Sequence, residues 1–165
     1  MKIIVDTNII FSALLKTHTT FGQIIFNSDG IFEFYSPHYL RTEIRNHWDK
    51  IKKISKLTDQ QLEESFDSLL TKISFINEEI IPQKIWEDSE KITEGIDVDD
   101  TDFIALTKYL KAKLWTGDIE LRNGLKSKGF KSVWTTAEIL KHWTKKKKES
   151  KTAANKMFLQ WCGDV

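Results

Sequence analysis

The sequence has little cysteine, little proline and almost no excess of charge. Its 165 residues include one cysteine, Cys162, and two prolines, and the net charge is +1 at pH 7. A single cysteine excludes an internal disulfide framework and a zinc site built from several cysteines. The 25 Lys and Arg residues balance 24 Asp and Glu residues, so bulk charge does not predict polyanion binding. Any nucleic-acid binding therefore depends on where individual charges lie.

Long apolar runs are also missing. No stretch is long enough to cross a bilayer, and the apolar residues that follow Met1-Lys2 stop at Asp6, unlike the core of a signal peptide. We therefore expect a cytoplasmic protein without a membrane partner. With 40% hydrophobic residues, the chain is long enough for one sizeable core. We predict one domain over residues 1–144 and a basic tail or helix extension over residues 145–165.

Short strand patterns alternate with helical patterns along the chain. Strands are predicted at residues 2–5, 31–35, 113–116 and 131–134. Helices are predicted after Asp6, from Ser36-Pro37 as N-cap and first position, at 58–72, at 83–93, at about 100–111, after Gly117-Asp118 and near Thr135. Because a parallel crossover needs a covering helix, this alternation predicts an α/β fold with a parallel sheet.

Carboxylates stand where the predicted strands end. Asp6 ends the first strand, and Asp118 lies two residues past the strand that ends in Thr116. Ligands of open parallel sheets bind outside the carboxyl ends of the strands. Either residue alone would more often be a helix N-cap, because an aspartate accepts hydrogen bonds from the free amides of a helix start.

Two further acidic segments complete the pattern. Four aspartates, Asp97, Asp99, Asp100 and Asp102, precede an apolar helical pattern, and by themselves they favour a solvated loop with a cap. Glu43 lies at the edge of the apolar stripe of its helix, which is also compatible with a surface position. Several carboxylates packed together raise one another's pKa values unless cations neutralise them. Their convergence on one sheet edge therefore predicts a site for a hard divalent cation, Mg²⁺ or Mn²⁺.

Four segments, taken in order, resemble the motifs of the PIN-domain family. They are Ile3-Ile4-Val5-Asp6-Thr7-Asn8-Ile9-Ile10, the helical Glu43, Asp97 to Leu106, and Trp115-Thr116-Gly117-Asp118. The resemblance spans nearly the whole chain to about residue 140. It implies a three-layer α/β/α sandwich, dependence on Mg²⁺ or Mn²⁺, and endoribonuclease activity. Many single-domain members are VapC-like toxins held in check by an antitoxin protein, which makes an antitoxin and a homodimer the expected protein partners.

The resemblance also assigns residues. Asp6 matches the first metal ligand, Glu43 the second and Asp118 the fourth, while Asp100, five residues before Ala105, is the preferred third. Asp97 shares a face with Asp100 if the helix begins early, and Asp102 is either a further ligand or a surface residue. Asn8 and Thr116 resemble the polar residues that orient the ligands. The commonest toxin pattern has a single aspartate before this helix, so the cluster favours a divergent subgroup.

The implied chemistry is metal-assisted hydrolysis of an RNA phosphodiester. Basic side chains would attract the RNA backbone, and one tryptophan near the cleft would stack on a base. The basic candidates are Lys16, Lys108, Lys111, Arg122, Lys126, Lys128 and Lys145 to Lys148.

Other functional classes were weighed against this one. A catalytically inactive PIN-like module that binds RNA or protein remains the alternative. A phosphotransfer protein with Asp6 as acceptor is disfavoured because Asp6-Thr7-Asn8 lacks the second aspartate of the phosphatase motif. A dinucleotide-binding domain is disfavoured because no glycine fingerprint follows the first strand.

Overall fold

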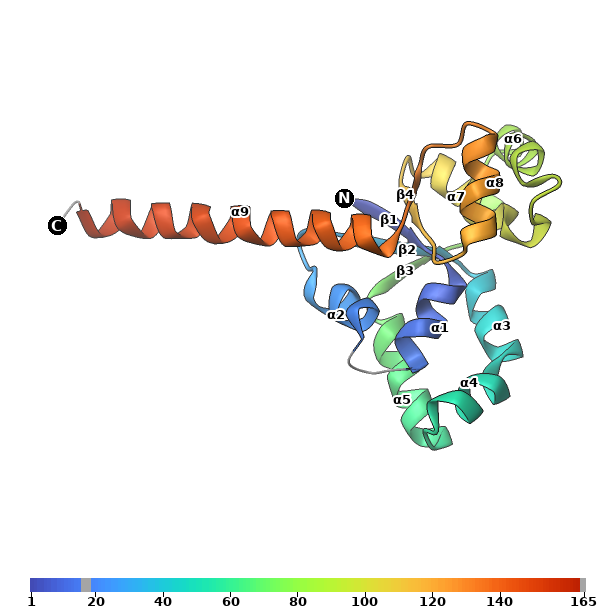
Figure 1. Ribbon diagram of the computed structural model, residues 1–165, viewed down its shortest axis with the longest axis horizontal. Coiled ribbons are helices and arrows are strands. Elements are labelled where there is room, and N and C mark those ends of the chain that lie inside the picture. The colour runs from blue at the N-terminus through green and yellow to red at the C-terminus, as the bar shows by residue number, and fades with distance from the viewer. Residues whose placement is uncertain (16–18, 164–165) are drawn as a thin grey trace.

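A parallel sheet forms the centre of the computed structural model, which describes residues 1–15 and 19–163, with side chains up to residue 153 (Figure 1). Within those ranges the sheet has five strands in the order β3-β2-β1-β4-β5. Each neighbouring pair is parallel. The strands are β1 (Lys2–Val5), β2 (Glu33–Pro37), β3 (Ile73–Ile76), β4 (Lys113–Trp115) and β5 (Val133–Trp134).

Helices cover both faces of the sheet, so the predicted α/β/α sandwich is confirmed (Figure 1). One layer contains α1 (Thr7–Leu15), α2 (Thr20–Asn27), α3 (Tyr39–Asn46), α4 (Trp48–Ser55) and α5 (Asp59–Leu70). The other contains α6 (Gln83–Thr93), α7 (Thr101–Tyr109) and α8 (Ile119–Ser127). Two short 3₁₀ turns are η1 (Glu78–Ile80) and η2 (Val98–Asp100). The last helix, α9 (Thr136–Gly163), contacts α2 and β5 and then extends beyond the other elements.

The core lies on both sides of β1 and β4. Ile3, Ile4 and Val5 are fully buried, as expected for a central parallel strand whose two faces are both covered by helices. Trp115, also fully buried, stacks on Phe21 of α2 with 6.1 Å between ring centroids. The two central strands therefore form a rigid base for the residues that follow them.

The structure corrects the predicted start of α3. Pro37 does not begin this helix but ends β2, in register with Ile76. The buried Ser36 hydroxyl donates a hydrogen bond to the Val5 carbonyl (3.0 Å) instead of capping a helix, and the His38 amide continues the ladder to the Ile76 carbonyl (3.3 Å). The helix begins two residues later than predicted, at Tyr39.

The edge strand β3 was missing from the sequence prediction. Its residues Ile73–Ile76 pair with β2, although they form only four positions between a helix and a turn. The preceding predicted helix is confirmed with slightly tighter bounds, because the Thr58 hydroxyl caps it by accepting from the Gln61 amide. Helix α6 has the predicted bounds.

Across the described ranges, no single helix is long and apolar enough to cross a membrane. Only α1 and α2 taken together, across a bend of 107°, reach that length and composition. Both helices bury apolar residues in the core, including Ile10 and Ile24.

Candidate metal centre

The ends of two neighbouring strands position Asp6 and Asp118. Asp6 follows β1, and its amide donates a hydrogen bond to the Trp115 carbonyl of β4 (3.2 Å). Asp118 follows β4 and caps α8, where its Oδ1 accepts from the Leu121 amide (2.8 Å). The capping role weighed for Asp118 is therefore real, but it occupies only one carboxylate oxygen.

Thr116 and Asn8 hold the Asp6 carboxylate in place. Oδ2 of Asp6 accepts hydrogen bonds from the Thr116 hydroxyl and from Asn8 Nδ2, the latter at 2.7 Å. The same hydroxyl accepts from the Asp118 amide (3.0 Å), and Asn8 Oδ1 accepts from the Gly117 amide (3.0 Å). The two polar residues thus connect both strand ends through side chains.

Glu43 reaches the same edge from α3. The hydroxyl of Thr7, in the first turn of α1, donates a hydrogen bond to Glu43 Oε2. Thr7 was absent from the sequence prediction, because its partner lies 36 residues away and only the packing of α1 on α3 brings the two together.

The aspartate loop adds a third segment. Asp97 is extended and caps η2, its Oδ1 accepting from the Asp99 amide (3.0 Å). Helix α7 begins only at Thr101, so the helix does not begin early enough to place Asp97 on a shared face with Asp100. Asp100 precedes this helix without a side-chain capping bond, which leaves its carboxylate free for the pocket.

These segments surround one open pocket of about 340 Å³, which we call the carboxylate pocket. It is lined by Asp6, Thr7, Asn8, Phe11, Glu43, His47, Lys50, Asp97, Asp99, Asp100 and Asp118. Sequence reasoning had not included Phe11, His47 or Lys50. Lys50 and His47 come from the start of α4 and its cap, and Lys50 Nζ lies 5.7 Å from the centre of the Phe11 ring.

Asp102 lies apart from this group. It lines a neighbouring hollow with Tyr39 and Glu78 on the other side of the α7 start. Asp100 belongs to η2 and Asp102 to the first turn of α7, and the two side chains line different hollows. In this hollow, the Tyr39 amide donates a hydrogen bond to Glu78 Oε1 (2.8 Å).

Burial and mutual repulsion act on the carboxylates. Burial raises the pKa of Asp6 to about 6, although its hydrogen bonds from Thr116 and Asn8 act in the opposite direction. Burial, followed by the nearby charges of Asp6, Asp97 and Asp118, raises the pKa of Asp100 to about 8. Burial and the charge of Glu78 raise the pKa of Asp102 to about 6. The ionised forms of these three carboxyl groups are therefore disfavoured.

The donor set fits a hard divalent cation. All the acidic ligands are carboxylate oxygens, which Mg²⁺ and Mn²⁺ prefer, and a cation would relieve the repulsion that raises the pKa of Asp100. Among the residues that the structure describes, no three His, Cys, Asp or Glu side chains lie close enough together to form a group that could hold a metal ion. Mg²⁺ does not require a group of three, because it keeps several waters and binds through one or two carboxylates together with substrate phosphate.

The predicted basic residues lie at several places. Lys108 pairs with Asp88 (3.8 Å), and Lys128 donates to the carbonyls at the end of α6, including that of Lys91 (3.0 Å). Arg122 Nη1 lies 3.5 Å from the Thr116 carbonyl, beside the carboxylate pocket. The lysines of α9 from Lys141 to Lys151 are exposed, and Lys16 lies outside the described residues.

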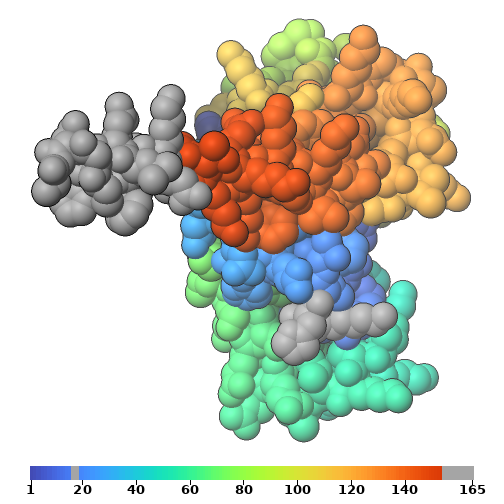
Figure 2. Space-filling view, turned by 60° about the vertical axis from the view of Figure 1, so that its left-hand side comes forward, coloured from blue at the N-terminus to red at the C-terminus, as the bar shows by residue number. Residues whose placement is uncertain are grey.

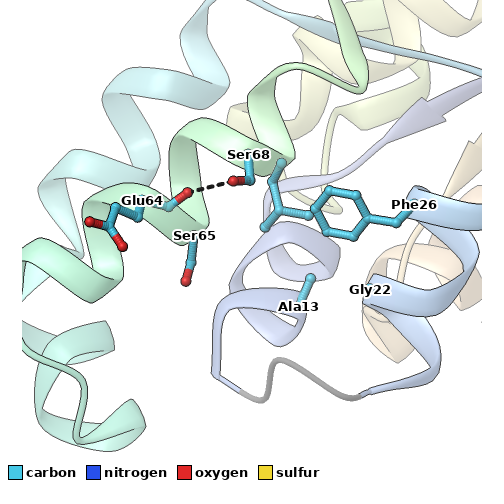
Figure 3. Close-up of a pocket in the computed structure, with 7 residues that line it drawn as sticks. Ala13, Gly22, Phe26, Glu64, Ser65 and Ser68 are labelled. Atoms are coloured by element: carbon cyan, nitrogen blue, oxygen red, sulfur yellow. Dashed lines mark hydrogen bonds between the residues drawn. The ribbon is translucent and has the colours of Figure 1, made fainter.

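A second hollow, of about 260 Å³, lies between α1, α2 and α5 (Figure 3). Ala13, Gly22, Phe26 and Leu69 give it an apolar lining, with the two serines and Glu64 of α5 at its side. The serine hydroxyls donate to carbonyls of their own helix (both 2.7 Å). This apolar hollow contains no cluster of titratable groups and has no chemistry comparable to that of the carboxylate pocket.

The fold and the site together define an α/β protein whose ligand pocket lies at the carboxyl ends of a parallel sheet. The model of the PIN domain matches residues 4–150, and the chain belongs to this family. The match includes every residue of the carboxylate pocket.

A solved structure shares the fold. It is the crystal structure of VapBC2 from Rickettsia felis bound to a DNA fragment from their promoter, with a TM-score of 0.60 and 16% sequence identity. The alignment covers 82% of this chain and 97% of that chain. No curated protein matches the sequence.

Proposed function

We propose that the chain is a Mg²⁺- or Mn²⁺-dependent endoribonuclease that hydrolyses RNA phosphodiesters at the carboxylate pocket. One observation carries the proposal. Asp6, Glu43, Asp100 and Asp118, which come from four separate segments of a PIN-family chain, line one pocket and supply only oxygen donors. Asp97 is a further candidate ligand in the same pocket, whereas Asp102, which faces another hollow, is the weakest.

The residues of the pocket have different proposed roles. Asp6 and Asp100 would hold the ion with Glu43 and Asp118, and the bound ion supplies an activated water at neutral pH and stabilises charge on the phosphate. Thr116 and Asn8 keep the Asp6 carboxylate oriented, and Thr7 does the same for Glu43. Lys50 is the lysine in the pocket lining and would contact a phosphate oxygen as a point charge.

We also propose that the protein acts in the cytoplasm as the toxin of a toxin-antitoxin pair. Support comes from the shared fold with the Rickettsia felis VapBC2 complex. Expression of the wild-type chain in bacteria should arrest growth, while Asp6→Asn should not. Equal growth with both chains at equal protein levels would contradict a toxin role. Association into a homodimer and the division at residue 144 remain predictions.

The test of the nuclease is cleavage of an end-labelled single-stranded RNA pool with Mn²⁺ or Mg²⁺, with DNA of the same sequences in parallel. Asp6→Asn should reduce the rate by more than about 100-fold, because each carboxylate ligand contributes several kcal/mol through the metal. The matched control is Asp29→Asn, which changes an exposed carboxylate paired with Lys72 (3.3 Å).

Excess EDTA should abolish the wild-type activity, and the control should cleave like the wild type. Cleavage that survives EDTA would contradict the metal mechanism, and cleavage of the DNA alone would contradict RNA as substrate. Absence of any cleavage, with Mn²⁺ binding that Asp6→Asn weakens, would favour the inactive RNA- or protein-binding module instead.

A further inference from the structure

A further hollow lies where the edge strand β5 leads into α9. It is a hollow of about 240 Å³, lined by Trp134, Glu138, Lys141, His142 and Lys145. Trp134 belongs to the edge strand β5, and the other four residues belong to the first turns of α9. Small-molecule pockets typically measure roughly 300–1,000 Å³, so this one suits a single ring system better than a whole cofactor.

The wall of the hollow is aromatic and firmly supported. The Trp134 ring lies 5.3 Å from the His142 ring, and His142 in turn stacks at 5.7 Å on the buried Phe32. The next residue of α9, Trp143, donates its indole N–H to the Asn27 carbonyl of α2 (3.3 Å). Figure 2 shows this part of α9 seated on α2. Trp134 is half-buried, so it offers part of its ring to a ligand without being free to move away.

The rim of the hollow is basic. Lys141, Lys145 and Lys148 follow one another at helical spacing along a single face of α9, and all three are exposed. Lys141 forms no ion pair among the described residues, and Lys145 lies 3.9 Å from Glu149. The one acid of the lining, Glu138, is used internally, because its Oε2 accepts from the amide (2.7 Å) and hydroxyl (2.9 Å) of Thr135 at the helix start.

One strand, β4, separates the strand of the hollow from the strand that carries Asp6. The Trp134 carbonyl accepts a hydrogen bond from the Thr116 amide (3.4 Å), and the Thr116 hydroxyl donates to Asp6. Strands β1, β4 and β5 are consecutive in the sheet, so the ends of β1 and β5 are separated by two strand spacings, roughly 10 Å. A few nucleotides of one RNA strand are enough to span such a distance.

We propose that this hollow is an RNA subsite, in which Trp134 stacks on an unpaired base of the bound strand while Lys141 and Lys145 hold the backbone. The inference rests on the proposed function for its substrate. An aromatic face combined with a lysine row is the recognition device for single-stranded nucleic acid, because every base has a π face and every nucleotide a phosphate. The strand then continues along the lysine face of α9 towards Lys148.

The test measures binding apart from cleavage. Fluorescence anisotropy would follow a labelled single-stranded 12-nucleotide RNA titrated with the full chain in EDTA, at several salt concentrations. Lys141→Ala should weaken binding about fivefold and lower the salt slope by about one, because one phosphate contact is lost. Trp134→Ala should weaken binding about tenfold, within the range of one lost base stack, and Trp134→Phe should restore most of it.

The matched control is Lys84→Ala, which removes an exposed lysine of α6 in the opposite helical layer. Circular dichroism checks the fold of Trp134→Ala, and the Lys141→Ala, Lys145→Ala double variant, which changes only exposed residues, tests the subsite if that variant does not fold. In cleavage assays with Mn²⁺, the double variant should raise the KM for the 12-mer without changing kcat.

The outcomes separate the two proposals. Loss of RNA binding in the variants, together with no cleavage by the wild type, would contradict the nuclease and keep the subsite. Normal cleavage and wild-type affinity in all variants would overturn the subsite and keep the nuclease. A wild-type chain that binds no RNA in the assay would also overturn the subsite.

Discussion

The carboxylate pocket and the apolar hollow share one helix and have similar size, yet they differ in kind. Thr7, Asn8 and Phe11 at the start of α1 line the first, and Ala13 near its end lines the second. Their volumes are about 340 and 260 Å³. The first concentrates six carboxylates, and the second presents mostly apolar side chains. The volume of a hollow alone therefore does not identify the functional site.

The difference lies in free energy. Apolar side chains in the hollow lower the free energy of the fold by burial, whereas the carboxylates raise it by desolvation and repulsion, as the raised pKa values of Asp6 and Asp100 indicate. Folds retain such desolvation and repulsion where a bound ligand relieves them. Groups with perturbed pKa values therefore mark functional sites.

The strongest test of this contrast is the pH dependence of metal binding. Asp100 is protonated below a pKa of about 8 in the metal-free protein and must lose its proton to bind the ion. The affinity for Mn²⁺, measured by calorimetry, should rise on the order of 50-fold from pH 6 to pH 8 if one such proton is released. An affinity that is flat over this range would remove Asp100 from the site.

The same pKa values set the sign of the stability change without metal. A carboxyl whose folded pKa is raised stabilises the fold at low pH, and this contribution is lost as pH rises through the folded pKa. The metal-free protein should therefore lose stability in urea titrations between about pH 4 and pH 8, and Mn²⁺ should reverse the trend at pH 8.

Thr116→Val should have the next largest effect. It keeps the size of the side chain but removes the hydroxyl that donates to Asp6 and accepts from the Asp118 amide. We expect Mn²⁺ affinity and cleavage to fall by roughly 10–100-fold, as for other residues that orient ligands. The pKa of Asp6 should rise further, because this hydrogen bond lowers it. Unchanged affinity would mean that Thr116 only supports the strand end.

Gly124→Ala tests the placement of the aspartate loop. A Cβ at Gly124 would lie 2.7 Å from both Cγ1 and Cγ2 of Ile96, the residue before Asp97. Because a 1 Å misplacement costs on the order of 100-fold in catalysis, a partial shift of the loop should lower cleavage roughly tenfold. Adding Ile96→Ala makes room and should recover most of the loss. No recovery in the double variant would contradict steric displacement of this loop.

Phe26→Ala, in the apolar hollow, should have the smallest effect on the site. Phe26 is 38% exposed, so its removal should lower the free energy of unfolding by only ~1–2 kcal/mol. Mn²⁺ affinity and its pH profile, measured as for the wild type, should stay the same. A changed metal affinity would show that the two regions are coupled and that the apolar hollow also affects metal binding.

Sequence patterns predicted the fold best where local signals and tertiary structure agree. The buried apolar run of β1 ends directly before Asp6, and that of β4 ends at Trp115, within one residue of the predicted end. The start of α3 was wrongly predicted at Pro37, because the fixed backbone angle of proline fits both a first helical turn and the end of a strand. Only the pairing with β3, a strand too short to recognise, decides between them.

The candidate site was predictable only in part for the same reason. The carboxylates follow strands or precede helices, which sequence spacing shows. Thr7, Phe11 and Lys50 join the pocket because α1 packs against α3 and α4, and a contact of this kind leaves no local signal. Whether Asp97 shares a face with Asp100 depended on the first residue of α7, and a helix boundary is the least certain part of any sequence pattern.

The carboxylates of the pocket come from a strand end and from a short turn, and the backbone amides of these two segments should exchange hydrogen at different rates. Asp6 is hydrogen-bonded between the two central strands, and its amide should exchange with solvent hydrogen only when the whole domain unfolds. Asp99 and Asp100 belong to a short 3₁₀ turn that Asp97 caps and whose Val98 is 68% exposed, and such turns open locally at low free-energy cost. Hydrogen exchange should thus divide the pocket into a slow half and a fast half, with capture of the ion slowing exchange mainly in the fast half.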